Sequence, residues 1–388
     1  MDWAARGKAL LSPFVARRAD GRDAALDAFK GIAIIGMMLV NHQPPTDHVY
    51  APFVHALWNG WTFADTIFPA FLFAVGMSIV FALGDANGRP VPRAGVHRRI
   101  ARRALLLVLI SLLLVNFPYY QFDKPGLAGV LSQIALCYLV AALLYLHTRS
   151  RTQAIVLVAL LLANWAWLTL VDVPGVGRGV LTPDGASARY LDRLLFGPLA
   201  QGFETGENSP YGVLMHVSSI SSTLLGLLAG RWMRTARSLG SRLAGLLVGG
   251  AALIALAALW NAALPINKLL WTSSFMLFMG GLALIVIAAL YALIDILHAG
   301  AITVPLQIAG VNALFFYVFA QSVQRILVYG RFTDESGAKV RFRHYIYENW
   351  FVPIDGGKLG AMLYTLCFLA LCYAVVAWLY RRRLLIKL

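Results

Sequence analysis

Charged residues are scarce in this chain, since Asp, Glu, Lys and Arg make up only 13% of its 388 residues while 59% are hydrophobic. This balance argues against one to three ordinary soluble domains and indicates an integral membrane protein. Several apolar runs are long enough, or nearly so, to cross a hydrocarbon layer of about 30 Å as helices: 104–117, 154–171, 243–259, 275–294 and 361–380. Their apolar residues do not alternate with polar ones, which disfavours a membrane β-barrel.

Cysteine is also rare, and Cys137, Cys367 and Cys372 all lie inside apolar segments. We therefore expect neither a disulfide framework nor a metal site, and interpret the three thiols as packing residues. The sequence has no Gly-rich nucleotide loop, no His-x-x-x-His pair and no nucleophile elbow. The N-terminus lacks the apolar core and small-residue cleavage site of a signal peptide. Templates taken from soluble enzymes therefore do not apply.

The predicted fold is an all-α membrane protein, a single bundle of about ten transmembrane helices. A basic segment at 1–25 is expected to precede a transmembrane domain at 26–388, and no internal repeat is evident. The ten predicted spans lie near 26–43, 62–84, 102–118, 128–146, 153–171, 212–230, 242–262, 270–294, 304–328 and 358–380.

The distribution of basic residues predicts the orientation of these spans. The loops on the side of the N-terminus carry 22 Lys and Arg residues, whereas the loops on the other side carry 9. Because basic loops stay in the cytoplasm, both termini are predicted to be cytoplasmic. The net charge of +15 is thereby explained without a nucleic-acid partner.

The stretch VHALWNGWTFAD, residues 54–65, gathers scarce polar groups at the predicted outer surface. If 54–61 is helical, Trp58 and Asn59 share a face with His55. Asp65 follows closely enough to orient an imidazole, the side chain best matched to proton transfer near neutral pH. The alternative is an interfacial histidine beside an aromatic belt of Trp58 and Trp61. The residues alone leave both interpretations open.

A second outer cluster, LPINKLLWTSSF at residues 264–275, begins the eighth predicted span. An aromatic belt with a snorkelling lysine accounts for Trp271 and Lys268. It does not require Asn267 and Ser274 in addition.

On the predicted inner side, Arg98 and Arg102 share one helical face, and Arg99 and Arg103 share another. Positive-inside signalling with anionic lipid contact explains these arginines fully. The alternative is a docking surface for the phosphates of a large anionic cofactor. Polar residues inside spans, among them Gln133 and Asn312, usually face the bundle interior or a water-filled cavity.

At the start of the first span, Asp23 or Asp27 is predicted to cap or complement the helix N-terminus. Lys30 follows Asp27 at i+3, where the two side chains are neighbours. Pro44 and Pro45 end this span and leave Asn41 at its outer mouth.

Together these residues resemble the transmembrane acyltransferases typified by heparan-alpha-glucosaminide N-acetyltransferase and its bacterial relatives. The resemblance covers nearly the whole chain from about residue 24. It rests on the motifs LDAFKGIAIIGMMLVN, HALWNGWTFADTIFPAFLFAVGMSI, GVLSQIALCYLVAALL, YLDRLLFG, LPINKLLWTSSFML and GVNALFFYVFAQ.

The resemblance implies acetyl transfer from cytoplasmic acetyl-CoA to an amino sugar or glycan across a bacterial inner membrane. It implies that His55 is the active-site histidine and Asn41 a functional asparagine, with Asp65 or Asn59 setting the imidazole tautomer. The expected donor-binding residues are Arg98, Arg99, Arg102, Arg103, Gln133 and Asn312. The expected acceptor-binding residues are Trp58, Asn59, Asn267, Lys268, Trp271 and Ser274. No metal is expected, and a homodimer is left open.

Three departures from the family pattern bear on the substrate. Lys30 replaces the usual arginine, Ser132-Gln133 replaces Gln-Arg, and Ser209-Pro210-Tyr211-Gly212 replaces Asp-Pro-Glu-Gly. Two other functions stay open: an amino-sugar transporter, as some bacterial relatives are described, and an inactive or scaffolding membrane protein. The broken helices common in secondary transporters are not evident in the sequence.

Overall fold

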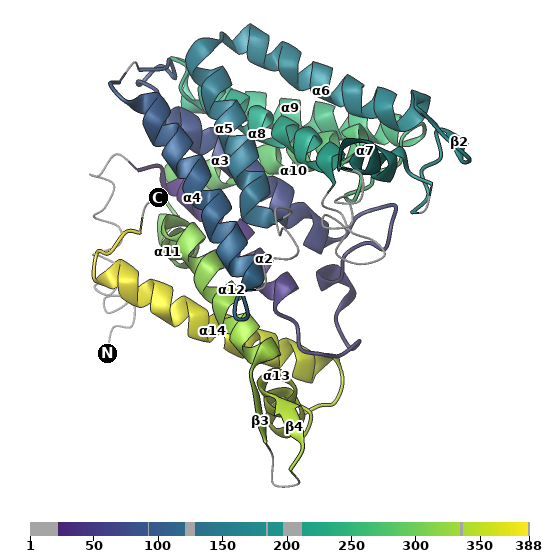
Figure 1. Ribbon diagram of the computed structural model, residues 1–388. Coiled ribbons are helices and arrows are strands. Elements are labelled where there is room, and N and C mark those ends of the chain that lie inside the picture. Colours follow the sequence, from purple (N-terminus) through teal and green to yellow (C-terminus); the bar gives the residue numbers. More distant parts are fainter. Residues whose placement is uncertain are drawn as a thin grey trace. The chain divides into compact units, whose positions relative to one another are not determined.

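The computed structural model describes residues 22–91, 93–120, 129–183, 185–196, 212–333 and 337–386, and helices dominate it (Figure 1). Eight helices are long and apolar enough to cross a membrane, and a bent pair makes a ninth if it forms one span. The predicted all-α membrane class is confirmed. The chain divides into two compact units, which share the helices α3 (Phe63–Leu83) and α10 (Ser273–Tyr291).

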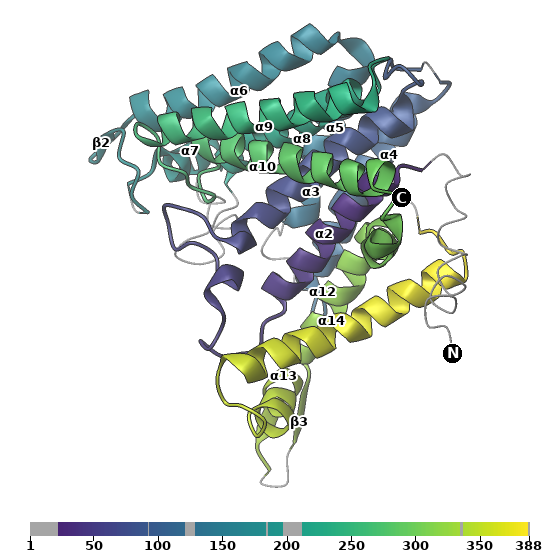
Figure 2. The ribbon, with the colours of Figure 1, turned by 180° about the vertical axis from the view of Figure 1, so that it is seen from behind.

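The first unit contains residues 22–55, 62–67 and 286–386 of the described chain. Figure 2 shows α2, α12 and α14 of this unit. Its elements are α2 (Ala24–Asn41), η2 (Ala51–Phe53), η4 (Ala292–Ile296), η5 (Gly300–Thr303), α11 (Val304–Val311), α12 (Ala313–Tyr329), β3 (Arg331–Thr333), β4 (Lys339–Arg341), α13 (Phe342–Ile346), η6 (Tyr347–Phe351) and α14 (Lys358–Arg381).

The second unit contains most of the sequence between residues 56 and 285. In it α4 packs on α5, and α5 and α6 both pack on α8. Its elements are α4 (Val96–Asn116), α5 (Val130–His147), α6 (Ser150–Leu170), β1 (Asp172–Val173), β2 (Gly177–Arg178), α7 (Ser187–Phe196), α8 (Val213–Met233) and α9 (Leu239–Asn261).

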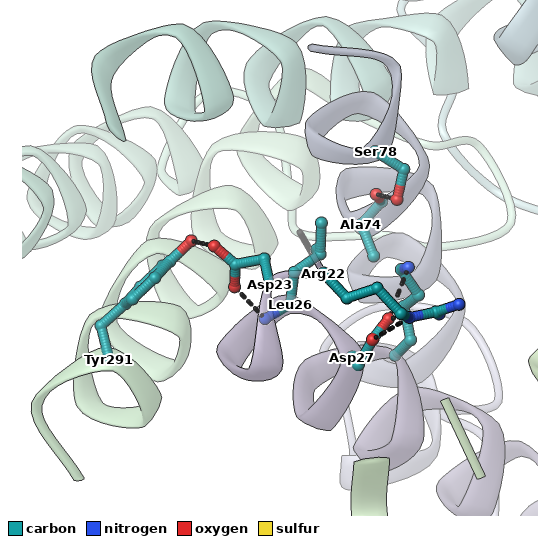
Figure 3. Close-up of polar contacts among 8 residues, drawn as sticks. Arg22, Asp23, Leu26, Asp27, Ala74, Ser78 and Tyr291 are labelled. Carbon is teal, nitrogen blue, oxygen red and sulfur yellow. Dashed lines mark hydrogen bonds and ion pairs between the residues drawn. The ribbon is translucent and has the colours of Figure 1, made fainter. Parts of the chain in front are cut away.

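The start of α2 is fixed by two aspartates with different tasks (Figure 3). Asp23 is the N-cap residue: its carboxylate accepts a hydrogen bond from the Leu26 amide at 2.8 Å and another from the Tyr291 hydroxyl at 2.6 Å. Asp27 pairs with Lys30 at 3.1 Å and with Arg22 at 3.0 Å. The predicted i+3 pair is confirmed, and Asp23 is the capping residue.

α2 packs closely against α11 because glycines line the crossing. A Cβ atom built on Gly31 would collide with the backbone of Leu306, and one on Gly310 would collide with the backbone of Asp27. Only glycine permits two helix backbones to approach so closely. This contact holds α11 closely against α2.

The predicted span at 304–328 is a broken helix, bent by 67° between the stretches Gly300–Val311 and Ala313–Tyr329. Asn312 occupies the break and is 1% exposed. Its amide donates to the Leu384 carbonyl at 3.3 Å and accepts from the Ile386 amide at 3.2 Å. Asn312 thus anchors the C-terminal segment, and the chain has a discontinuous helix that its hydropathy does not reveal.

The other predicted spans all coincide with helices. α4 is not among the eight most apolar helices because its first two turns carry the four arginines Arg98, Arg99, Arg102 and Arg103. Most of the predicted basic segment 1–25, and Ser209, Pro210 and Tyr211, lie outside the described residues.

Candidate functional site

The loop that carries His55 is built by local sequence signals. Pro44 and Pro45 cannot continue α2, and the chain stays irregular apart from η2 until α3 begins at Phe63. Asp65 reaches back from the first turn of α3 and accepts a hydrogen bond from the Thr62 amide at 3.0 Å. This is the return half of a capping box, and it places the carboxylate at the mouth of the loop.

His55 meets that carboxylate directly, with Nδ1 at 2.8 Å from Asp65 Oδ1. Asp65 is 1% exposed, whereas the His55 side chain is 45% exposed. A buried carboxylate accepts hydrogen bonds, so it holds the proton on Nδ1 and leaves the lone pair on Nε2. The pair therefore has the arrangement that a general base or a nucleophile requires.

The condition of a helix at 54–61 is not met, since the chain is irregular between η2 and α3. Trp58 and Asn59 consequently do not share a helical face with His55. Asp65, rather than Asn59, is the partner of the imidazole. Asn59 instead accepts a hydrogen bond from the Asn267 amide at 3.2 Å within the second unit.

Asn41 is the last residue of α2, and its side chain is exposed. The next residue, His42, is fully buried: its Nδ1 lies 3.1 Å from the Met38 carbonyl, and its ring stacks on Phe368 at 4.6 Å. This packing holds the end of α2 and keeps the Asn41 amide at the start of the loop that leads to His55.

Trp58 lines a pocket in the second unit. Its indole N–H donates to the Leu181 carbonyl at 2.6 Å, which fixes the ring. Arg189 and Asp192 from α7 contribute charge to the same pocket, and Asp192 also accepts a hydrogen bond from the Val213 amide at 2.8 Å at the start of α8. Sequence reasoning missed both residues, although they lie beside or within the motif YLDRLLFG.

The four candidate residues of the cluster at 264–275 are buried or half-buried. Asn267 is 1% exposed, and its side chain accepts from the Leu270 amide at 2.9 Å, so it shapes the turn before α10. Trp271 and Ser274 are also buried: the indole donates to Ser222 Oγ at 3.3 Å, and the Ser274 hydroxyl donates to the Leu264 carbonyl at 2.6 Å. Lys268 is half-buried.

Asn312, one of the residues predicted to bind the donor, has its amide engaged by the backbone of Leu384 and Ile386. The other five fall into two groups. Arg98, Arg99, Arg102 and Arg103 are exposed on the first two turns of α4. Gln133 on α5 is fully buried, and among the described residues neither its amide nitrogen nor its oxygen has a hydrogen-bond partner. An orphaned amide of this kind is uncommon and calls for a polar ligand or water. It fits the polar groups of a long donor such as acetyl-CoA.

Residues 22–188 match the sequence model of a family described as heparan-alpha-glucosaminide N-acetyltransferase, catalytic. The human heparan-alpha-glucosaminide N-acetyltransferase is 29% identical over 350 residues, which cover 76% of this chain and 52% of the human protein. The mouse protein is 27% identical over 362 residues, covering 79% and 54% respectively. The chain thus spans about half the length of these curated relatives. The chain is similar to the heparan-alpha-glucosaminide N-acetyltransferases in its sequence.

Proposed function

We propose that this membrane protein transfers the acetyl group of acetyl-CoA to the amine of an amino sugar or glycan, with His55 as the base. The contact between His55 Nδ1 and Asp65 Oδ1 carries the proposal, since it leaves the exposed imidazole with a lone pair on Nε2. The sequence similarity supplies the reaction class. We place the protein in a bacterial inner membrane, with the donor on the cytoplasmic side and the acceptor on the other side.

The reaction needs one proton acceptor and one group that stabilises negative charge. The acceptor nitrogen forms a bond to the acetyl carbonyl carbon while His55 Nε2 takes its proton. The carbon–sulfur bond then breaks, and the imidazolium returns the proton to the departing thiolate. Asp65 stabilises the imidazolium between these steps. General-base assistance of this kind contributes about 10² to 10⁴ in rate.

Asn41 is the group we assign to the thioester oxygen, where its amide would donate a hydrogen bond as negative charge develops. Such a donor contributes about 10² to 10³ in rate. Trp58 would offer the acceptor sugar a flat apolar face in the pocket that it shares with Arg189 and Asp192. The exposed arginines of α4 would hold the donor's phosphates, because guanidinium groups bind phosphate in a bidentate manner.

The test uses the purified full chain, acetyl-CoA with a labelled acetyl group, and a panel of amino sugars. We expect label in the acceptor only when both substrates are present, and no label in an acceptor that lacks the amine. Failure of every amino sugar and glycan on the panel to take up label would contradict the proposal. Acid quench before the acceptor is added separates the two routes, since only an acetyl-histidine intermediate leaves label on the protein.

A transport function is the second candidate, favoured by the broken helix at Asn312. Discontinuous helices form substrate sites in many secondary transporters. Uptake of labelled N-acetylglucosamine into proteoliposomes without acetyl-CoA would support transport. If acetyl-CoA is strictly required for any turnover, transport is excluded.

A further inference from the structure

One arginine of the first unit lies beside the end of α2. Arg343, on α13, donates to the Gln43 carbonyl at 2.8 Å, two residues beyond Asn41. Among the described residues no carboxylate pairs with it. The guanidinium is half-buried, and burial lowers its pKa, with the nearby Arg341 acting in the same direction. A cation in this setting gains free energy from an anionic partner.

Two buried tyrosines near Arg343 have hydroxyl groups with no hydrogen-bond partner among the described residues. Tyr347 is 2% exposed and Tyr364 is 3% exposed. Their rings meet edge to face at 6.0 Å. Tyr347 lies one turn beyond Arg343, and Tyr364 interacts electrostatically with the guanidinium. Arg343 Nε is unpartnered in the same part of the structure.

These groups have one chemistry in common, since a guanidinium and two phenols are all hydrogen-bond donors. Leaving a buried donor unsatisfied costs about 1 to 3 kcal/mol, so three of them together need an explanation. An oxyanion with several acceptor oxygens satisfies a guanidinium and neighbouring hydroxyls at once.

The β3–β4 hairpin adds further positive charge. Arg331 and Arg341 are directly opposite each other in its register, and Lys339 is exposed on the same face as Arg341. Like charges placed opposite each other across a strand pair destabilise it. The hairpin and α13 hold four of the nine basic residues on the predicted outer side, where the positive-inside rule disfavours them. Such a concentration is consistent with an anion bound nearby.

Apolar side chains on the same segment indicate where the anion comes from. Phe342, Tyr345, Trp350, Ile354 and Leu359 are all more than a third exposed, and Trp350 is 64% exposed. Exposed aromatic and aliphatic residues of this kind mark a membrane interface. A phosphate bound beside them would therefore belong to a lipid, whose acyl chains these residues would contact. In Figure 1, α13 and the hairpin lie together at one end of α14.

We propose that Arg343, Tyr347 and Tyr364 bind the phosphate of an anionic membrane phospholipid. The bound lipid would steady the segment that holds the end of α2, where Thr365 also donates to the Gln43 side chain at 3.1 Å and His48 Nδ1 lies 2.9 Å from the Gly356 carbonyl. The site shares no residue with the His55–Asp65 pair, and the proposal does not depend on acetyl transfer.

The experiment titrates the detergent-purified full chain with phosphatidylglycerol, phosphatidylcholine or inorganic phosphate, and follows binding by native mass spectrometry and by the melting temperature. We expect phosphatidylglycerol to bind and to raise the melting temperature, because a ligand that binds only the folded state stabilises it. Arg343→Gln should weaken this binding about tenfold. Arg178→Gln, at an arginine that is 71% exposed, is the matched control and should bind as the parent does.

The double variant Tyr347→Phe, Tyr364→Phe keeps the proposal testable if Arg343→Gln fails to fold. It removes two hydroxyls that have no hydrogen-bond partner in the described part of the chain, so the lipid-free protein should melt no lower than the parent. Its stabilisation by phosphatidylglycerol should fall. Unchanged lipid binding in the double variant or in Arg343→Gln would overturn the proposal. Equal affinity for inorganic phosphate and phosphatidylglycerol would also overturn it, because the site would then take a soluble anion.

Discussion

Asp65 holds two partners at once: one carboxylate oxygen lies 2.8 Å from His55 Nδ1, and the other accepts the Thr62 amide at 3.0 Å. The same buried side chain therefore orients the imidazole and closes the first turn of α3. A substitution at Asp65 can affect catalysis, helix stability or both, and the choice of replacement separates the two effects.

Asp65→Asn should leave the fold nearly unchanged, because the amide oxygen can still accept from Thr62. The amide has no charge to stabilise an imidazolium and can turn an N–H toward Nδ1, which would move the imidazole proton to Nε2. We expect kcat to fall by about 10² to 10⁴. Asp65→Ala also loses the cap of α3, so its free energy of unfolding should fall by about 1 kcal/mol. An Asp65→Asn enzyme with parental kcat would contradict the assigned role.

Trp58→Ala should raise the KM for the amino sugar by about tenfold while the KM for acetyl-CoA stays at its parental value. Trp58→Phe keeps a flat aromatic face but loses the hydrogen bond to Leu181. Its KM for the amino sugar should therefore lie between the values of the parent and of Trp58→Ala. Steady-state kinetics with each substrate varied in turn makes the comparison. Equal changes in both KM values would indicate that Trp58 has only a structural role and does not bind the acceptor.

Gly31→Ala should destabilise the protein by about 3 kcal/mol or more, because the added methyl group meets the Leu306 backbone, which cannot move aside as a side chain could. Gly240→Ala on α9 is the matched control. No heavy atom beyond the immediate chain lies within 4 Å of its added Cβ, so helix propensity alone should make it neutral or slightly stabilising. Similar melting temperatures for the two variants would contradict the close packing of α2 on α11.

The helices could be predicted because long apolar runs and capping residues are local signals. Asp23, Lys30 and the proline pair after Asn41 all act within one or two turns of their own position. The break at Asn312 was not predictable in this way. A single asparagine in an apolar run does not bend a helix by itself, and its partners, Leu384 and Ile386, lie more than 70 residues away.

The candidate site could be predicted only in part, because contacts with distant segments leave no local signal in the sequence. The pairing of His55 with Asp65 follows from their closeness in sequence and from the start of α3. The surroundings of Trp271 and Ser274 depend on which neighbours pack over them, and hydropathy gave no indication that both are buried. Arg343, Arg189 and Asp192 were missed because their importance depends on contacts with distant segments rather than on a motif around them.

The role of His55 as the base is tested by the rate of acetyl transfer by His55→Ala, measured with labelled acetyl-CoA under saturating acceptor and compared with the parent protein. We expect kcat to fall by about 10² to 10⁴ while the melting temperature stays near the parental value, because the His55 side chain is nearly half exposed. A folded His55→Ala protein that transfers acetyl as fast as the parent would contradict this role.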